Sequence, residues 1–150
     1  MRAVPFHNIQ SAEVHVDAAV GLPALFICAR ASIKVIEAGS MKIVSASNPY
    51  SFSRVDSEAR APKFDLFLSF PELIQEKDAI VLVRIDALEN RSMSAKCAGY
   101  AWLNLYVDKT SGKRPERDAS DDSVCLNSGV FLLPLFTGTY LPTYDTYDRK

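Results

Sequence analysis

The sequence predicts an all-β fold, an antiparallel eight-stranded β-sandwich in a single domain. Two observations support this class. Several short segments, such as 12–18 and 64–70, alternate apolar and polar residues with a period of two, which is typical of half-buried strands. Turn-forming residues separate these segments at short intervals and leave little room for helices. The 150 residues suffice for one domain with its own core, which we place at about 11–138.

The first two strands are expected before residue 37. Residues 1–10 should form an extended lead-in, because Pro5 disfavours a helix, and 12–18 is the first strand. In 25–36 every residue of one parity is apolar, whereas the other parity includes Arg30 and Lys34, so this segment predicts a strand with one buried face. A helix stays open for its first half, since alanine and leucine favour helices.

The middle of the chain predicts three further strands. A short strand is expected at 41–46 and a clearly alternating one at 64–70, whereas 50–62 shows no clear element. Residues 71–77 suit a single helical turn. The segment 79–86 is nearly continuous in β-branched and other apolar residues, which indicates a central strand.

Two apolar segments close the predicted fold, after a polar loop at 89–96. Residues 98–108 and 125–136 are rich in aromatic and β-branched residues, and the polar segment 109–123 joins them. We therefore expect two strands linked by a long charged loop. They contain the single tryptophan, Trp102, and the densest run of large apolar residues, so they should anchor the core.

Composition narrows the class of protein. The net charge of −1 gives no basic stripe of the kind that nucleic-acid-binding domains show, so we expect no nucleic-acid partner. The widely spaced Cys28, Cys97 and Cys125 fit reduced thiols better than a disulfide framework or a zinc site. The N-terminus lacks the apolar core of a signal peptide, and no apolar run reaches the ~20 residues of a membrane-spanning helix. A soluble, cytoplasmic protein is expected.

No catalytic, metal-binding or cofactor-binding pattern stands out. His7 and His15 lack a nucleophile context. His15 shares a strand face with Glu13 and Asp17, but such side chains lie ~6–7 Å apart, too far to chelate a metal tightly without another strand. The acidic group in 118–122 lacks the oxygen pattern and central glycine of an EF-hand. Nucleotide-loop, nucleophile-elbow and zinc-protease motifs do not occur, so we expect neither enzyme activity nor a cofactor.

Three groups of residues are candidates for partner contact. Cations on the second and third strands suit anionic lipid or an acidic partner, the alternative being an ordinary polar sheet face. The long loop carries a basic group whose field the following aspartates weaken. The tail after 138 suits packing along a surface of this chain or of a partner. The candidates are, in that order, Arg30, Lys34 and Lys42; Lys113, Arg114 and Arg117; and Tyr140, Tyr144 and Tyr147.

Several segments, taken in order, resemble C2 domains over about 11–138. The pattern V-x-x-A-x-x-L-P at 16–23 is similar to the strand that leads into their first apical loop, and 64–70 to an aromatic-rich strand after their middle hairpin. The segment AWLN at 101–104 resembles the A-W-x-N segment of phosphoinositide-3-kinase-type C2 domains. The pair GYAWLNLYVD and LNSGVFLLPLF looks like C2 domains of ciliary and centrosomal scaffold proteins.

The chain departs from this family at the loops that hold calcium. Loop 20–25 has no acidic residue, and the third apical loop offers only Asp86 and Glu89, with Leu88 where a second aspartate would fall. Calcium takes six to eight oxygen ligands, so we expect no calcium site. The resemblance implies a non-enzymatic interaction module with protein partners, a scaffold or structural subunit of a cytoskeletal or ciliary assembly. The alternative is a peripheral membrane module that binds anionic phospholipid through the basic sheet face.

Overall fold

The computed structural model describes residues 4–47, 53–54, 61–70 and 74–137. Within them it contains nine β-strands, two short 3-10 helices and no α-helix, which confirms the predicted all-β class. The helices are η1 (Phe6–Asn8) and η2 (Asp121–Ser123). The strands are β1 (Ala12–Ala18), β2 (Phe26–Glu37), β3 (Ile43–Ala46), β4 (Ser53–Arg54), β5 (Lys63–Phe70), β6 (Ala79–Glu89), β7 (Ala95–Asn104), β8 (Tyr106–Asp108) and β9 (Val124–Leu126).

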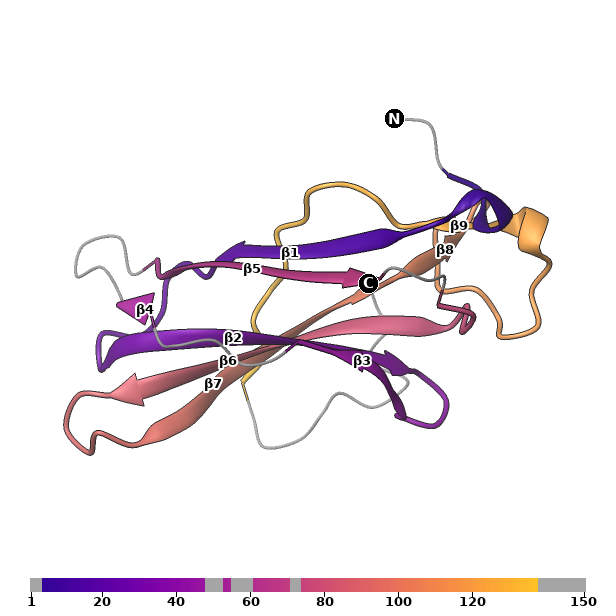
Figure 1. Ribbon diagram of the computed structural model, residues 1–150. Helices are drawn as coiled ribbons and strands as arrows, with labels where there is room; N and C mark the ends of the chain where they lie inside the picture. Colours follow the sequence, from indigo (N-terminus) through magenta and orange to yellow (C-terminus); the bar gives the residue numbers. More distant parts are fainter. Residues whose placement is uncertain (1–3, 48–52, 55–60, 71–73, 138–150) are drawn as a thin grey trace.

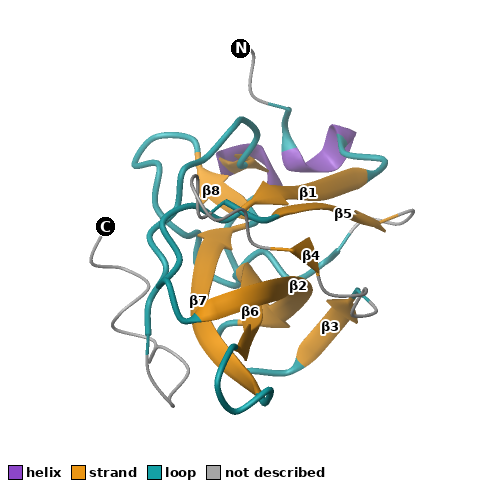
Figure 2. Ribbon diagram, turned by 90° about the vertical axis from the view of Figure 1, so that its left-hand side faces the viewer, coloured by secondary structure: helices purple, strands orange, loops and turns teal. Residues whose placement is uncertain are grey.

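The strands lie in two layers (Figure 1). The main sheet has the order β3-β2-β6-β7, with β4 also paired to β2, and all its pairings are antiparallel. The β1-β5 pair lies over this sheet, and the short β8-β9 pair lies beside it near the N-terminus (Figures 1 and 2). A layered antiparallel fold agrees with the predicted sandwich, although the described residues form nine strands rather than eight.

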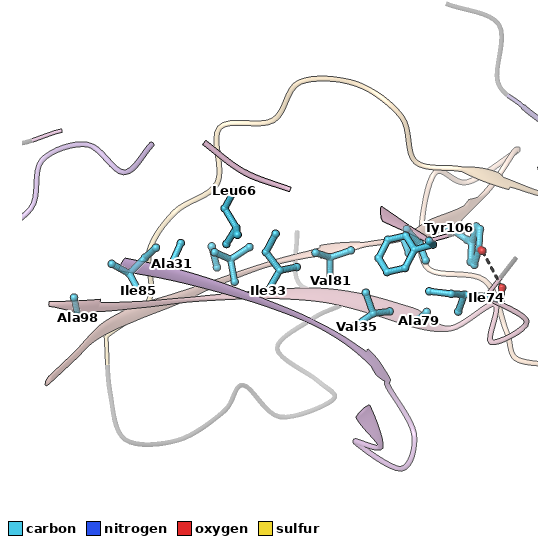
Figure 3. Close-up of a cluster of buried hydrophobic side chains, with 14 of the residues drawn as sticks. Ala31, Ile33, Val35, Leu66, Ile74, Ala79, Val81, Ile85, Ala98 and Tyr106 are labelled. Carbon is cyan, nitrogen blue, oxygen red and sulfur yellow. Dashed lines mark hydrogen bonds between the residues drawn. The ribbon is translucent and has the colours of Figure 1, made fainter. Parts of the chain in front are cut away.

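The main hydrophobic core fills the space between the layers (Figure 3). One face of β2 is almost completely inaccessible, and in the antiparallel register Ile33 lies opposite Val83 of β6, so both strands present apolar residues to the same side. Leu66 of β5 reaches this face from the upper layer. The predicted buried parity is thus confirmed over 29–35 but not at Leu25, which is exposed, or Ile27, which is half-buried, because the register of β2 shifts between Phe26 and Cys28. Strand β2 excludes the helix alternative. The buried β2 residues are Ala29, Ala31, Ile33 and Val35.

Tyr106 closes one end of this core. Its side chain is 1% exposed, and its hydroxyl donates a 2.8 Å hydrogen bond to the carbonyl of Ile74 (Figure 3). The ring packs edge-on against Phe6, with the ring centroids 5.1 Å apart. Phe6 belongs to η1, so part of the lead-in is helical instead of extended, and Pro5 forms an isolated antiparallel bridge with Cys125. The N-terminal segment is therefore a component of the core.

The first closing segment, 98–108, is divided between two strands, whereas one strand was expected. The reason is the length of β6. Asn104 lies opposite Ile80 in the register, and the N–H of Leu105 donates to the carbonyl of Ala79, the first residue of β6. Beyond that point β6 offers no partner, so the chain continues as β8 and pairs with β9 instead.

The second closing segment, 125–136, is a strand only at its start. After Leu126 the chain leaves β9, and Pro134 has no N–H to donate to a neighbouring strand. The expectation of a full strand is therefore wrong, although two strands joined by the charged loop are present as β8 and β9, which pair with each other. Of the expected turn at 71–77, residues 74–77 are not helical, and 71–73 fall outside the described part.

Candidate functional site

The outer face of the main sheet, turned away from the upper layer, carries a second apolar cluster. Trp102 belongs to this cluster rather than to the main core, which corrects the expected position of the tryptophan. Its ring stacks on Phe136, with centroids 4.2 Å apart. Phe136 is held in place because it exchanges two backbone hydrogen bonds with Tyr100, of 2.8 and 2.7 Å. The buried members are Ile36, Ala38, Ile80, Leu82 and Trp102.

A hollow of about 190 Å³ opens next to this cluster and crosses the main sheet from β3 to β7. Its apolar lining includes two side chains that are accessible to solvent, Met41 (36% exposed) and Ile43 (51% exposed). We call this feature the sheet-face hollow. It is lined by Ser32, Lys34, Ile36, Met41, Ile43, Leu82, Arg84 and Tyr100.

The charged side chains among these lining residues are both cationic. Arg84 Nε lies 2.8 Å from Asp86 Oδ1, and this hydrogen bond raises the pKa of the Arg84 guanidinium. Burial raises the pKa of the Tyr100 phenol, and a hydrogen bond with Cys97 adds to the effect. Lys34 forms no ion pair with a described residue. The hollow therefore combines an apolar lining, a neutral phenol, one paired cation and one cation that faces solvent.

The predicted basic patch is only partly assembled. Arg30 and Lys34 share the outer face of β2, but Arg30 Nε lies 3.8 Å from Asp86, so its charge is shared with that carboxylate. Lys42 lies in the turn before β3 and does not line the hollow. The hollow instead brings Lys34 together with Arg84. Arg84 was missed in the sequence, although the outward parity of β6 would have placed it on this face.

The basic loop residues have mixed roles. Arg117 forms an ion pair with the buried carboxylate of Glu37, and Arg114 is half-buried. The Arg117–Glu37 pair therefore links the long loop to β2, while the side chains of Arg117 and Lys113 both stay exposed. The tail tyrosines lie within 138–150, outside the described residues, so their predicted contact is not tested here.

Asp86 and Glu89, which were expected on a third apical loop, lie in β6 instead, and cations engage both carboxylates. Glu89 pairs with Lys96, and their hydrogen bond is the main reason why the pKa of Glu89 is lowered. Asp86 pairs with arginines, as described above. On the upper layer, His15 is exposed as predicted, and its Nε2 lies 2.8 Å from Asp65 of the neighbouring strand. Within the described residues, no group of three potential metal ligands is assembled.

A further apolar surface lies on the segment 127–137, which we call the strap. It leaves β9, passes along one side of the two layers and reaches β7 (Figures 1 and 2). Leu133 and Leu135 pack against the main core and close its side. Phe136 stacks on Trp102, whereas three consecutive apolar side chains, 130–132, face solvent. Val130 is fully exposed, Leu132 is 90% exposed and Phe131 is 43% exposed.

Two loops also expose apolar side chains at the end of the main sheet where β2 and β7 begin and β6 ends. We call residues 19–25 and 90–94 the end loops. They are joined by a 2.9 Å hydrogen bond from the N–H of Asn90 to the carbonyl of Leu25. Their exposed apolar residues are Val20 (67%), Leu25 (47%) and Met93 (62%).

Comparison of the chain with models of known protein families and with curated proteins found no match. In the described part of the chain, no helix has the length and apolar character needed to cross a membrane.

Proposed function

We propose that this chain is a non-enzymatic, calcium-independent protein-interaction module built on a C2-like sandwich. The observation that carries the proposal is the strap, on which three consecutive large apolar residues, 130–132, face solvent. Monomeric proteins expose single apolar side chains freely, but a contiguous exposed run is typical of a contact surface. The setting, a scaffold or structural subunit of a cytoskeletal or ciliary assembly, is inferred from the sequence resemblance alone.

The strap is suited to this role because some of its residues pack against the core while others face solvent. Leu133 and Leu135 are fixed by the core, so the neighbouring exposed side chains are presented on an anchored backbone. Burying a side chain such as Leu132 against a partner is worth about 1.5–3 kcal/mol. Val130 adds a contribution of the same kind, so the pair suits the apolar centre of a protein interface.

Affinity capture with the wild-type chain and the Val130→Ser, Leu132→Ser double variant tests this proposal. We expect a defined set of proteins to co-purify with the wild type and the double variant to lose them, with affinity reduced at least about tenfold. The matched control is Val20→Ser with Met93→Ser, which removes two exposed apolar residues elsewhere. Equal capture by all three proteins would contradict the proposal. Thermal unfolding checks that each variant is folded.

A second candidate function, peripheral binding to anionic phospholipid, is favoured by the end loops and by the cations of the outer sheet face. Exposed apolar loop residues can enter the headgroup region, and nearby cations add electrostatic attraction. Co-sedimentation with phosphatidylserine-containing vesicles separates the two candidates. Salt-sensitive binding that is lost on charge reversal at Arg30, Lys34 and Lys42 favours the membrane. Absence of vesicle binding leaves the protein interaction as the function.

A further inference from the structure

We infer that the sheet-face hollow binds an acidic linear segment of a protein partner, which inserts one apolar anchor side chain. This inference deepens the proposed interaction function and depends on it. The size of the hollow is the first argument. Pockets for small molecules and cofactors occupy about 300–1,000 Å³, whereas this one has about 190 Å³. It is too small for a typical cofactor and suits a single large side chain, which is how interface anchors are held.

The chemistry of the lining is the second argument. Ile36 and Leu82 supply apolar surface, and the partly exposed Ile43 and Met41 extend that surface toward solvent. An apolar anchor such as leucine or methionine would remove the exposed parts of Ile43 and Met41 from water. Buried apolar area of this kind contributes about 25 cal/mol per Å².

The charged residues that line the hollow, Lys34 and Arg84, determine which kind of partner segment can bind around the anchor side chain. Lys34 has no ion pair with a described residue, and the carboxylate of Asp86 is already engaged by Arg30 and Arg84. A partner carboxylate next to the anchor would therefore meet an unpaired ammonium group. A basic segment would instead place like charges against Lys34 and Arg84 and is disfavoured.

The protein's own strap shows how a linear segment uses this face. Phe136 pairs its backbone with Tyr100 and places its ring on Trp102, in the cluster that adjoins the hollow. Tyr100, whose backbone pairs with Phe136, is also one of the residues that line the hollow. The partner segment would thus lie beside an intramolecular segment that is already bound through one aromatic anchor.

The test is a titration of the intact ¹⁵N-labelled chain with two capped pentapeptides, followed by NMR chemical shifts. The acidic probe carries a central leucine flanked by aspartate and glutamate, and the basic probe has lysine and arginine in those positions. We expect the acidic probe to give saturable shifts at the amides of Ser32, Lys34 and Tyr100. Lys34→Glu should weaken this binding at least about fivefold, because an attraction becomes a repulsion. The matched control is Lys63→Glu, an exposed strand lysine on the upper layer, which should bind normally.

Three results would overturn the inference: no saturable shifts, equal binding of both probes, or unchanged binding by Lys34→Glu. Saturable shifts of the same amides with phosphatidylserine nanodiscs, in the absence of any peptide response, would assign the hollow to lipid and also overturn it. Failure here is distinguishable from failure of the proposed function, because partner capture by the strap is measured separately with the Val130→Ser, Leu132→Ser variant. Folding of each variant is verified from its amide spectrum.

Discussion

Tyr106 is the residue on which one end of the core most clearly depends. Removing its hydroxyl in Tyr106→Phe leaves the carbonyl of Ile74 buried without this donor, while the packing against Phe6 is kept. We expect the free energy of unfolding to fall by about 1–3 kcal/mol, measured by urea denaturation. Burial also raises the pKa of the Tyr106 phenol far above its ordinary value of 10.0, so in the native protein this tyrosine should ionise only well above pH 10.0. Wild-type stability in the variant would contradict this role.

Asp108 gives the prediction for pH dependence. Its carboxylate accepts hydrogen bonds from the N–H of Ser111, the hydroxyl of Ser111 and the N–H of Thr110, which hold its pKa below the ordinary value of 3.8. A lowered folded-state pKa contributes stability above pH 3.8 that is lost as the pH falls toward the folded pKa. Asp108→Asn should therefore be less stable than wild type at neutral pH, and the difference should shrink below pH 3.8. Urea unfolding at several pH values measures it.

The control for that experiment is Asp118→Asn, an exposed carboxylate in the same loop. It should change stability little at any pH. If both variants behaved alike, the turn closed by Asp108 would not be the cause.

At the residue scale, the sequence predicted which side chains are exposed better than it predicted which residues they contact. The exposure of His15 and Lys34 follows from strand parity alone and was predicted. Their neighbours, Asp65 and Arg84, come from other strands and become identifiable only when the register is known. The ion pair of the exposed Arg117 with the buried Glu37 was not predicted, because the two residues lie 80 positions apart in the sequence.

At the element scale, strands with a buried face were predictable and their ends were not. The segments predicted at 12–18, 64–70 and 79–86 correspond to β1, β5 and β6, because alternation or continuous apolar character directly reports burial. The division between β7 and β8 depends on where β6 begins, which the local sequence of 98–108 does not contain. The strap looked like a strand because its apolar residues serve two faces, the core and solvent.

The contact between the strap and β7 can be tested at Gly99. A Cβ at this position would lie 2.6 Å from Leu135 Cγ and 2.7 Å from the carbonyl oxygen of Phe136. We expect Gly99→Ala to push the strap away, to weaken the stacking of Phe136 on Trp102 and to lower stability by about 1–3 kcal/mol. The emission of the single tryptophan should shift to longer wavelength as its ring becomes hydrated.

Gly39→Ala is the matched control for this variant, since a Cβ there meets only Asp78 Oδ2, at an ordinary 3.8 Å. It should leave tryptophan emission unchanged. Unchanged emission in Gly99→Ala as well would show that the strap does not depend on this close approach.

At the scale of the whole molecule, the all-β class and the antiparallel layers follow from the frequency of alternating segments and turns. The second apolar cluster was not foreseen. Trp102 and Leu82 have the outward parity of their strands, and Phe136 of the strap, which stacks on Trp102, belongs to the same cluster. The sheet-face hollow beside them likewise requires four strands to be in register.

The proposed calcium independence can be tested on the stability of the whole molecule. Any ligand that binds the native state raises its stability in proportion to the logarithm of ligand concentration over the dissociation constant. We expect excess calcium chloride to leave the midpoint of thermal unfolding equal to that in magnesium chloride. A calcium-specific increase would show that the carboxylates of Asp86 and Glu89 exchange their cationic partners for a metal, and calcium independence would be abandoned.

The central claim is that this chain binds a protein through the strap. Site-specific photo-crosslinking tests this claim most directly. A photoreactive amino acid replaces Val130 in one sample and the exposed Lys63 in another, and both chains are irradiated with the captured partner. We expect a covalent adduct from position 130 and none from position 63. An adduct only at position 63, or equal yields at both, would contradict the claim.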